Sequence, residues 1–415
     1  MGWVRKNYHW IIAAVAIMQM LVFGGAVNNF SGYHVIPVTA ALGISRTAFS
    51  LAESLGAAMG VLSTLFSGIV IQKFGYKKVV AFGLIIASSA YTVFSFLQNY
   101  PMLIIGCLMV GISKGICFVA GVSRIVNVWF HKYRGTVLGL VTAATGVGST
   151  LLGAAQAAAI EHVSWRLSFG IVAAFQMLMA VMVFLLVYNT PEDRGLQPLG
   201  EGQGDEKKRS NTAWDGFSQN FLKRSPAFYS LCICAFLSCM CVLATQYNIV
   251  PYFQDCGMSV TRTSKLYGTM MLVLGIFKLL MGVLCDAVGA KRVLVLSHIA
   301  CAAGLAAIML LPQTDTAMII ALIVYDLAIP LTTMMFPLIS AEVFGNQAYS
   351  WYVGIIMSMT TAGNIVSGPI ASAVRDSFGS YRPAFWVCAA LALLMIPAYG
   401  VLFGVTKRQR KKLEK

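Results

Sequence analysis

Three ionisable residues interrupt long apolar stretches of the 415-residue chain. They are Lys114 in VGISKGICF, Lys278 in LGIFKLLMGVLCD and Asp326 in LIVYDLAIPLTTMMFP. A charge at the depth of a lipid bilayer costs roughly 2.5 kcal/mol or more, so it usually binds a ligand, pairs with another charge or lines a pathway. An ammonium group can hold an anion, and a carboxyl group can carry a proton. These residues are therefore the first candidates for a binding site inside a membrane.

Each of the three also has a structural alternative. Lys278 lies within about one helical turn of Gly275 and Gly282, which share a face suited to helix packing, so we expect it to point inward. It could instead snorkel to the membrane surface or serve only in an ion pair. Lys114 could be a second cation for an anion or a structural partner of an internal acid. An isolated ionised Asp326 would be very costly, so it is either protonated and able to carry a coupled proton, or paired with Lys114 or Lys278.

Two dipeptides, Tyr33-His34 and Tyr247-Asn248, stand at matching places 214 residues apart. Their side chains could hydrogen-bond an anion, and histidine is a side chain type that can change its charge near neutral pH. The tyrosines could equally belong to an aromatic belt at the membrane interface.

The composition is that of a membrane protein. Hydrophobic residues make up 58% of the chain and charged residues 11%, where a soluble domain has about a quarter charged residues. Twelve apolar runs predict an all-α protein with twelve transmembrane helices: 9–32, 48–71, 78–97, 102–124, 134–158, 165–188, 227–250, 263–286, 291–311, 315–340, 350–372 and 381–405.

The basic residues predict the orientation in the membrane. With both termini on the cytoplasmic side, the cytoplasmic segments hold 21 Lys and Arg and the opposite segments hold 6. We therefore expect a multi-pass protein of the plasma (inner) membrane, whose basic tail, 406–415, can touch anionic lipid headgroups. The net charge of +15 reflects this asymmetry, and no nucleic-acid-binding module accompanies it.

No pattern indicates an enzyme. The sequence contains no nucleophile elbow, phosphate-binding loop or HExxH helix, so we expect no catalytic residues and no cofactor. The ten cysteines do not predict a metal site either, because Cys232, Cys234, Cys239 and Cys241 lie within one apolar run with no histidine nearby.

The chain is internally duplicated. At a constant offset of 214 residues, Pro37 matches Pro251, Gly75 matches Gly289, and Lys77 matches Lys291. We therefore predict an amino-terminal six-helix bundle (1–188), a flexible cytoplasmic linker (189–226), a carboxyl-terminal six-helix bundle (227–405) and the basic tail.

The loops after the second and eighth runs read G-x3-Q-K-x-G-x-K-K and G-x3-D-x2-G-x-K-R. This pattern resembles the cytoplasmic signature of the major facilitator superfamily. The stretches LGISRTAFSLAES, VWFHKYRGTVLGL and TPEDRGLQPLG resemble the oxalate/formate antiporter and monocarboxylate porter branch. The resemblance implies a gating role for the signature residues Gly68, Gly75, Lys77, Arg134, Gly282, Asp286, Gly289, Lys291 and Arg292.

Within that branch, a basic residue eight positions before the signature aspartate binds the substrate carboxylate, and Lys278 matches this position. Oxalate exchangers carry a second lysine in the eleventh span, where this chain has Thr360. The resemblance also implies that Asp286 acts as a cytoplasmic latch, with the neutral Gln72 at the matching place.

We expect a monomeric secondary transporter of small organic anions of the monocarboxylate type, working by alternating access with proton symport or anion exchange. One alternative is a proton-coupled exporter of drugs or other amphipathic solutes on the same fold. A second is a membrane receptor or scaffold that transports nothing. The identity of the anion and the direction of transport stay open.

Overall fold

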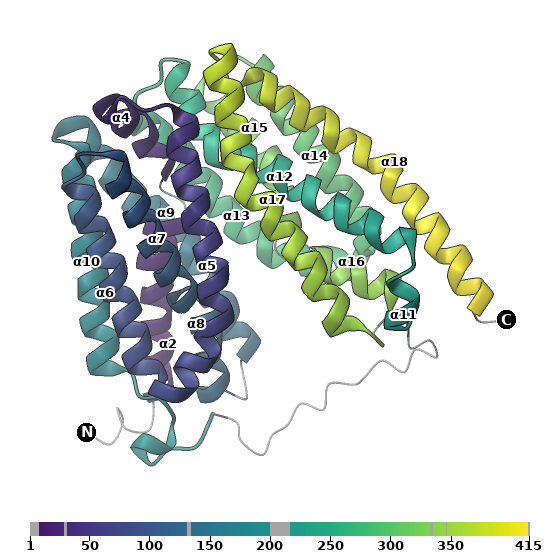
Figure 1. The fold of residues 1–415 in the computed structure, drawn as a ribbon, viewed down its shortest axis with the longest axis horizontal. Coiled ribbons are helices and arrows are strands. Elements are labelled where there is room, and N and C mark those ends of the chain that lie inside the picture. The colour runs from purple at the N-terminus through teal and green to yellow at the C-terminus, as the bar shows by residue number, and fades with distance from the viewer. Residues whose placement is uncertain are drawn as a thin grey trace. The chain divides into compact units, whose positions relative to one another are not determined.

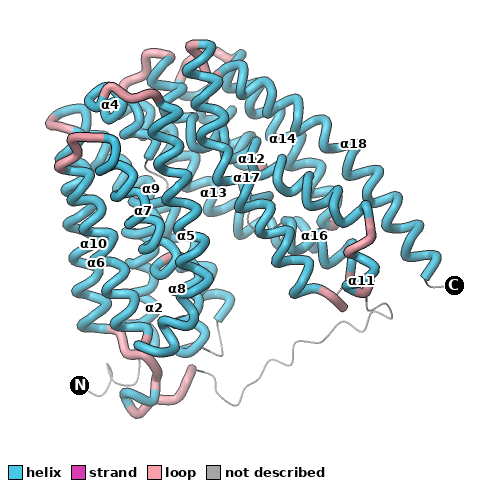
Figure 2. The backbone as a smooth tube through the Cα atoms, in the orientation of Figure 1, coloured by secondary structure: helices cyan, strands magenta, loops and turns pink. Residues whose placement is uncertain are grey.

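The computed structural model describes residues 8–28, 31–130, 134–199, 216–332, 335–345 and 347–413. The described backbone is helical throughout, with short connecting loops and only two isolated β-bridges (Figures 1 and 2). The helices of the first six predicted spans are α2 (Tyr8–Gln19), the π-helix η1 (Met20–Gly24), α3 (Gly25–Asn28), α4 (Ser31–Leu42), α5 (Arg46–Phe74), α6 (Tyr76–Ser95), α7 (Tyr100–Cys117), α8 (Val119–Trp129), α9 (Arg134–His162) and α10 (Trp165–Leu186).

A short 3-10 helix, η2 (Glu192–Arg194), and α11 (Gln219–Leu222) follow in the predicted linker. The remaining elements are α12 (Pro226–Asp255), α13 (Val260–Val288), α14 (Ala290–Leu310), α15 (Asp315–Asp326), the 3-10 helix η3 (Ile329–Thr332), α16 (Met335–Phe344), α17 (Tyr349–Phe378) and α18 (Arg382–Leu413). Within the described residues, eleven helical segments are long and apolar enough to cross a membrane. The 29-residue α13 covers the eighth predicted run, so the expected all-helical membrane architecture is confirmed.

The backbone repeats at the offset found in the sequence. Gly43 and Gly257 both end a helix with positive φ angles, 62° and 86°. Gly75 and Gly289 do the same in the two signature loops, with φ angles of 84° and 92°. Side chains with a Cβ atom rarely adopt this conformation, so the glycines are needed to turn the chain between spans.

The chain divides into two compact units whose limits differ from those of the two sequence halves. The first unit comprises Met1–Lys207 with Val250–Gly275, and the second comprises Lys208–Ile249 with Ile276–Lys415. The last turns of α12 and the first half of α13 therefore belong to the first unit. The sequence repeat reflects the duplication of the chain. The compact units instead reflect packing, which groups the end of α12 and the beginning of α13 with the first unit.

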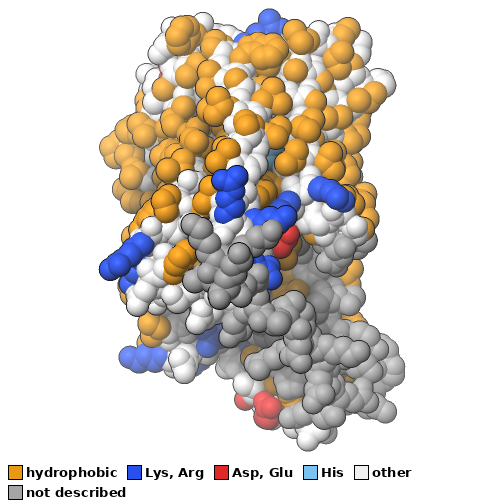
Figure 3. All heavy atoms as spheres, turned by 90° about the vertical axis from the view of Figure 1, so that its right-hand side faces the viewer, with side chains coloured by type: hydrophobic (Ala, Val, Ile, Leu, Met, Phe, Trp, Pro, Cys, Tyr) orange, Lys and Arg blue, Asp and Glu red, His pale blue; other side chains and the backbone are white. Residues whose placement is uncertain are grey.

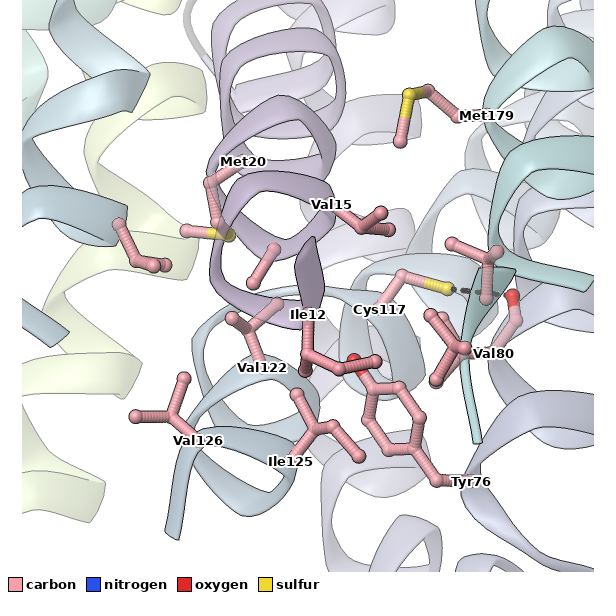
Figure 4. Close-up of a cluster of buried hydrophobic side chains, with 14 of the residues drawn as sticks. Ile12, Val15, Met20, Tyr76, Val80, Cys117, Val122, Ile125, Val126 and Met179 are labelled. Carbon is pink, nitrogen blue, oxygen red and sulfur yellow. Dashed lines mark hydrogen bonds between the residues drawn. The ribbon is translucent and has the colours of Figure 1, made fainter. Parts of the chain in front are cut away.

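The core of the first unit is built from the inward faces of α2, α6, α8, α9 and α10 (Figure 4). Ile12 and Val15 of α2 lie beside Val80 of α6 and Val122 of α8, and all four side chains are buried. The opposite faces of these helices are apolar as well: Phe82 of α6 is 62% exposed and Leu185 of α10 is 63% exposed. Figure 3 shows apolar side chains across the upper half of the face in view, as expected of a surface that contacts lipid.

The beginning of the predicted linker makes specific contacts with neighbouring helices, and its flexibility stays a prediction. The Arg194 guanidinium lies 4.0 Å from the centre of the Tyr8 ring and 4.4 Å from that of Tyr188. Farther along, the Leu199 amide donates a hydrogen bond to the Trp129 carbonyl at 3.0 Å. Aromatic side chains at the ends of three helices thus supply a surface on which residues 188–199 pack.

The end of the linker is held in an equivalent way. The Phe217 amide donates to the Phe344 carbonyl at 2.9 Å, and the Phe217 ring stacks on Phe221 at 4.8 Å. Phe344 matches Phe130 at the 214-residue offset, and Phe130 itself forms a bridge with Leu199. Each end of the linker is therefore fixed to the corresponding point of its own unit.

Candidate functional site

Two predicted spans are broken at nearly equivalent places. In the fourth, α7 ends at Cys117, Phe118 is extended with φ −81° and ψ −154°, and α8 begins at Val119. In the tenth, α15 ends at Asp326 and gives way to η3 before α16 begins at Met335. Non-helical backbone at membrane depth is tolerated where protein buries it or where it lines an aqueous cavity, and transporters build binding sites at such breaks.

Each break carries one of the candidate charges. Lys114 lies in the last turn of α7, and its carbonyl accepts the Phe118 amide at 3.2 Å. Asp326 is the final residue of α15. The partial negative charge at a helix carboxyl end stabilises a nearby cation and opposes a nearby anion. Lys114 is therefore favourably placed, whereas an ionised Asp326 needs a cation.

The surroundings of Asp326 sharpen this requirement. Its side chain is fully buried, and neither carboxylate oxygen has a hydrogen-bond partner among the described residues. Lys278 interacts with it electrostatically, yet in the described part of the chain no basic nitrogen lies within 4.0 Å of its oxygens. The direct ion pair that we considered is thus not formed in this structure. Because they are not in direct contact, the Lys278 ammonium group and the Asp326 carboxyl group could both interact with a bound ligand.

Lys278 lies near the middle of α13 and is half-buried. Its neighbour on the shared face, Gly275, would place a Cβ atom 4.0 Å from the carbonyl oxygen of Ala143 in α9. This face therefore approaches another helix, in agreement with the expected inward orientation.

A second acid and base occur in the first unit. Lys114 interacts electrostatically with Glu53 of α5, a residue that we did not include among the candidates. The two helices pack very closely: a Cβ atom at Gly56 would lie 2.4 Å from the Cys107 carbonyl oxygen, and one at Gly111 would lie 2.0 Å from that of Gly56. The single carboxylate in the apolar stretch LAESLGAAMG was the signal available in the sequence.

The two pairs occupy equivalent spans with opposite polarity. In the first unit the acid is on the second span and the base on the fourth. In the second unit the base, Lys278, is on the eighth span and the acid, Asp326, on the tenth. The helix pairs are therefore related by the duplication, but the positions of the acid and the base on them are not.

The structure does not place Tyr33 and His34 in such a site. His34 Nε2 lies 2.6 Å from Ser168 Oγ, and its buried ring stacks on Phe169 with 4.0 Å between ring centres. The buried Tyr33 ring lies edge-on to Tyr267 at 6.0 Å. These contacts give both residues packing partners within the first unit, and a substrate contact by either one stays a prediction.

The matching pair in the other half is split. The Tyr247 hydroxyl donates to Asn364 Oδ1 at 3.0 Å and its side chain is half-buried, so it stays a candidate. Asn248 is buried, donates to the Ala244 carbonyl at 2.9 Å and accepts from Ser372 Oγ at 3.3 Å. These bonds engage the Asn248 amide in helix packing, and a substrate contact by Asn248 stays a prediction.

The signature loops make specific contacts with their own units. The Gly68 carbonyl accepts from Arg124 Nη1 at 3.0 Å. The Lys77 amide donates to Asn189 Oδ1 at 3.0 Å. Lys291 Nζ lies 3.2 Å from Glu342 Oε1.

The other predicted gating residues are less fully placed. Gly282 lies within α13, and the Arg292 amide donates to the Gly289 carbonyl at 3.1 Å. The side chains of Asp286 and Arg134 lie outside the described residues, so the predicted latch stays a prediction.

Comparisons with known proteins agree with this architecture. A family model described as Major Facilitator Superfamily matches residues 10–348 and 231–415. The oxalate:formate antiporter of Oxalobacter formigenes is 23% identical over 408 residues, covering 94% of this chain and 92% of the antiporter. Monocarboxylate transporter 12 of Mus musculus is 20% identical over 389 residues, covering 86% and 77% of the two chains. Sugar phosphate exchanger 3 of Xenopus laevis is 31% identical over 205 residues, which span 45% of this chain and 39% of the exchanger.

Solved structures support the same fold. A crystal structure of a mutant of the nucleoside transporter NupG superposes with a TM-score of 0.77 and 14% identity, covering 96% of this chain and 100% of that one. At this identity the likeness speaks for the fold alone. Together with the family match across most of the sequence, it shows that the chain is a multi-pass membrane transporter, not an enzyme, and belongs to the major facilitator superfamily.

Proposed function

We propose that this chain transports small organic anions, monocarboxylates in particular, through a site centred on Lys278 and Asp326. The observation that carries the proposal is the buried Asp326 carboxyl group at the end of the broken tenth span. It has no hydrogen-bond partner among the described residues, and the Lys278 ammonium group interacts with it electrostatically without direct contact. A monocarboxylate is small, carries one negative charge and can accept hydrogen bonds from both groups when Asp326 is protonated.

The proposed cycle follows from charge balance. Without substrate, the positive Lys278 offsets a negative Asp326. A carboxylate that binds Lys278 removes this compensation, so Asp326 takes up a proton and donates a hydrogen bond. Anion and proton then cross together, or one anion returns in place of another. Lys114 and Glu53 balance each other in the first unit when no larger anion is bound, and Lys114 is the candidate second cation for such an anion.

Three alternatives compete with this proposal. A drug exporter on the same fold needs an essential acid, which Asp326 could supply. That function would not explain why Lys278 is present. Phosphate esters would also suit a compact ammonium group. A non-transporting receptor or scaffold does not require charges buried at broken helices.

A ligand panel tests the proposal. We expect formate, lactate or a similar monocarboxylate to raise the melting temperature of the purified protein, because a ligand that binds only the folded state stabilises it. Uncharged analogues of the same size serve as controls. Stabilisation by sugar phosphates or amphipathic cations, but by no carboxylate, would contradict the proposal.

We further propose that the protein works as a monomer in the plasma (inner) membrane with both termini in the cytoplasm. The native thiol of Cys256 provides the test, because it is the exposed cysteine among the described residues and follows the seventh span. An impermeant maleimide should label it from outside in right-side-out vesicles, and Cys256→Ser should remove the signal. Labelling that requires permeabilised vesicles would reverse the orientation.

A further inference from the structure

An arginine and an aspartate form a two-pronged ion pair in the first unit. Arg46 is the first residue of α5, and Asp255 is the last residue of α12. Arg46 Nη1 donates to Asp255 Oδ2 and Nη2 to Oδ1, both at 2.6 Å. The Arg46 side chain is only 9% exposed and that of Asp255 24%. A fork of this kind fixes both distance and orientation, and its partial burial protects it from screening.

Further contacts join the same regions. Thr150 of α9 donates to the Gly268 carbonyl at 2.8 Å. The Thr261 amide donates to Glu161 Oε2 at 2.8 Å. In each case a residue of the amino-terminal half meets the segment Val250–Gly275, which contains the end of α12 and the beginning of α13. These contacts explain why this segment groups with the first unit.

The ion pair is not a product of the duplication. At the 214-residue offset, Arg46 corresponds to Val260 and Asp255 to Ala41, so the equivalent positions carry no charge. The pair also lies at the ends of the second and seventh spans that are remote from the signature loops. The ion pair of Arg46 and Asp255 therefore has no counterpart at the positions related by the internal repeat.

We propose that Arg46 and Asp255 form a gate that closes the membrane side opposite the signature loops. Alternating access requires spans seven and eight to separate from the amino-terminal half on that side in one state. Opening must break the fork, and water entering the opened region then solvates both charges. The pair thereby sets how often this side opens, whatever the substrate. Our proposed orientation makes it the outer gate.

A buried reporter thiol measures opening directly. Ser264 is 4% exposed and lies in the segment that the gate holds. In a Cys256→Ser background, Ser264→Cys should react slowly with an impermeant maleimide added to the side of Cys256. Arg46→Gln and Asp255→Asn should each accelerate labelling by about tenfold or more, because each removes charge-assisted hydrogen bonds. The charge swap Arg46→Asp with Asp255→Arg should restore slow labelling.

Arg166 provides a matched control. It lies at the start of α10, where its guanidinium donates to the Leu97 carbonyl at 3.2 Å and lies 4.1 Å from the Trp165 ring centre. Arg166→Gln should leave the labelling rate of Ser264→Cys unchanged. If Arg46→Gln does not reach the membrane, Asp255→Asn carries the test. Labelling at the parent rate in the neutralised variants, or a charge swap that labels as fast as they do, would overturn the gate. Labelling of native Cys256 in the parent protein reports the orientation separately.

Discussion

Replacing Lys278 with glutamine is expected to reduce carboxylate exchange in proteoliposomes by at least about thirtyfold. Removing one partner of a buried, hydrogen-bonded charge pair costs about 2–5 kcal/mol, and each 1.4 kcal/mol changes binding about tenfold. The fold should survive, because the substitution also removes a costly buried charge. Lys265→Gln is the matched control: this lysine is exposed near the start of the same helix, and its loss should leave exchange intact.

Two further variants separate binding from a structural role. Lys278→Arg should keep part of the exchange with a changed preference among anions, because the guanidinium fork imposes a geometry that an ammonium group does not. If Lys278 served only to compensate Asp326, the double variant Lys278→Gln with Asp326→Asn would regain exchange. Recovery in the double variant would therefore contradict a direct substrate contact.

The second large effect concerns the proton. We expect Asp326→Asn to retain exchange of carboxylate for carboxylate but to lose accumulation driven by a pH gradient. Asparagine can still donate a hydrogen bond to the substrate but cannot gain or release a proton. The measurement compares counterflow at equal pH with uptake against an imposed gradient. Asp315→Asn, at the other end of α15, is the control and should accumulate substrate normally.

The outcome could contradict this assignment in two ways. Unchanged gradient-driven accumulation in Asp326→Asn would remove the proton role. Loss of exchange and accumulation together, in a folded protein, would assign Asp326 to substrate binding or helix packing instead.

Hydropathy and the repeat predicted the helices well because each span must satisfy its own backbone hydrogen bonds in lipid. The twelve runs and the positive-φ glycines at positions 75 and 289 follow directly from this requirement and from the duplication. The breaks after Lys114 and Asp326 were harder to foresee. Pro330 and Pro337 hinted at one, but Phe118 has no special sequence signal.

The contacts of individual side chains could not be predicted from the sequence either. A period of 3.6 residues identifies a face, but it does not tell which neighbour that face meets. His34 therefore looked like a ligand contact, although Ser168 and Phe169, over 130 residues away, enclose it. The link between Arg46 and Asp255 was invisible for the same reason, because its partners are 209 residues apart.

The central claim is that Lys278 binds the substrate carboxylate, and calorimetry on purified protein tests it most directly. The carboxylate that gives the largest thermal shift is titrated into the wild-type chain and into Lys278→Gln. We predict saturable binding to the wild type and no measurable binding to the folded variant. Equal affinities for the two proteins would contradict the account and favour an exporter of amphipathic solutes.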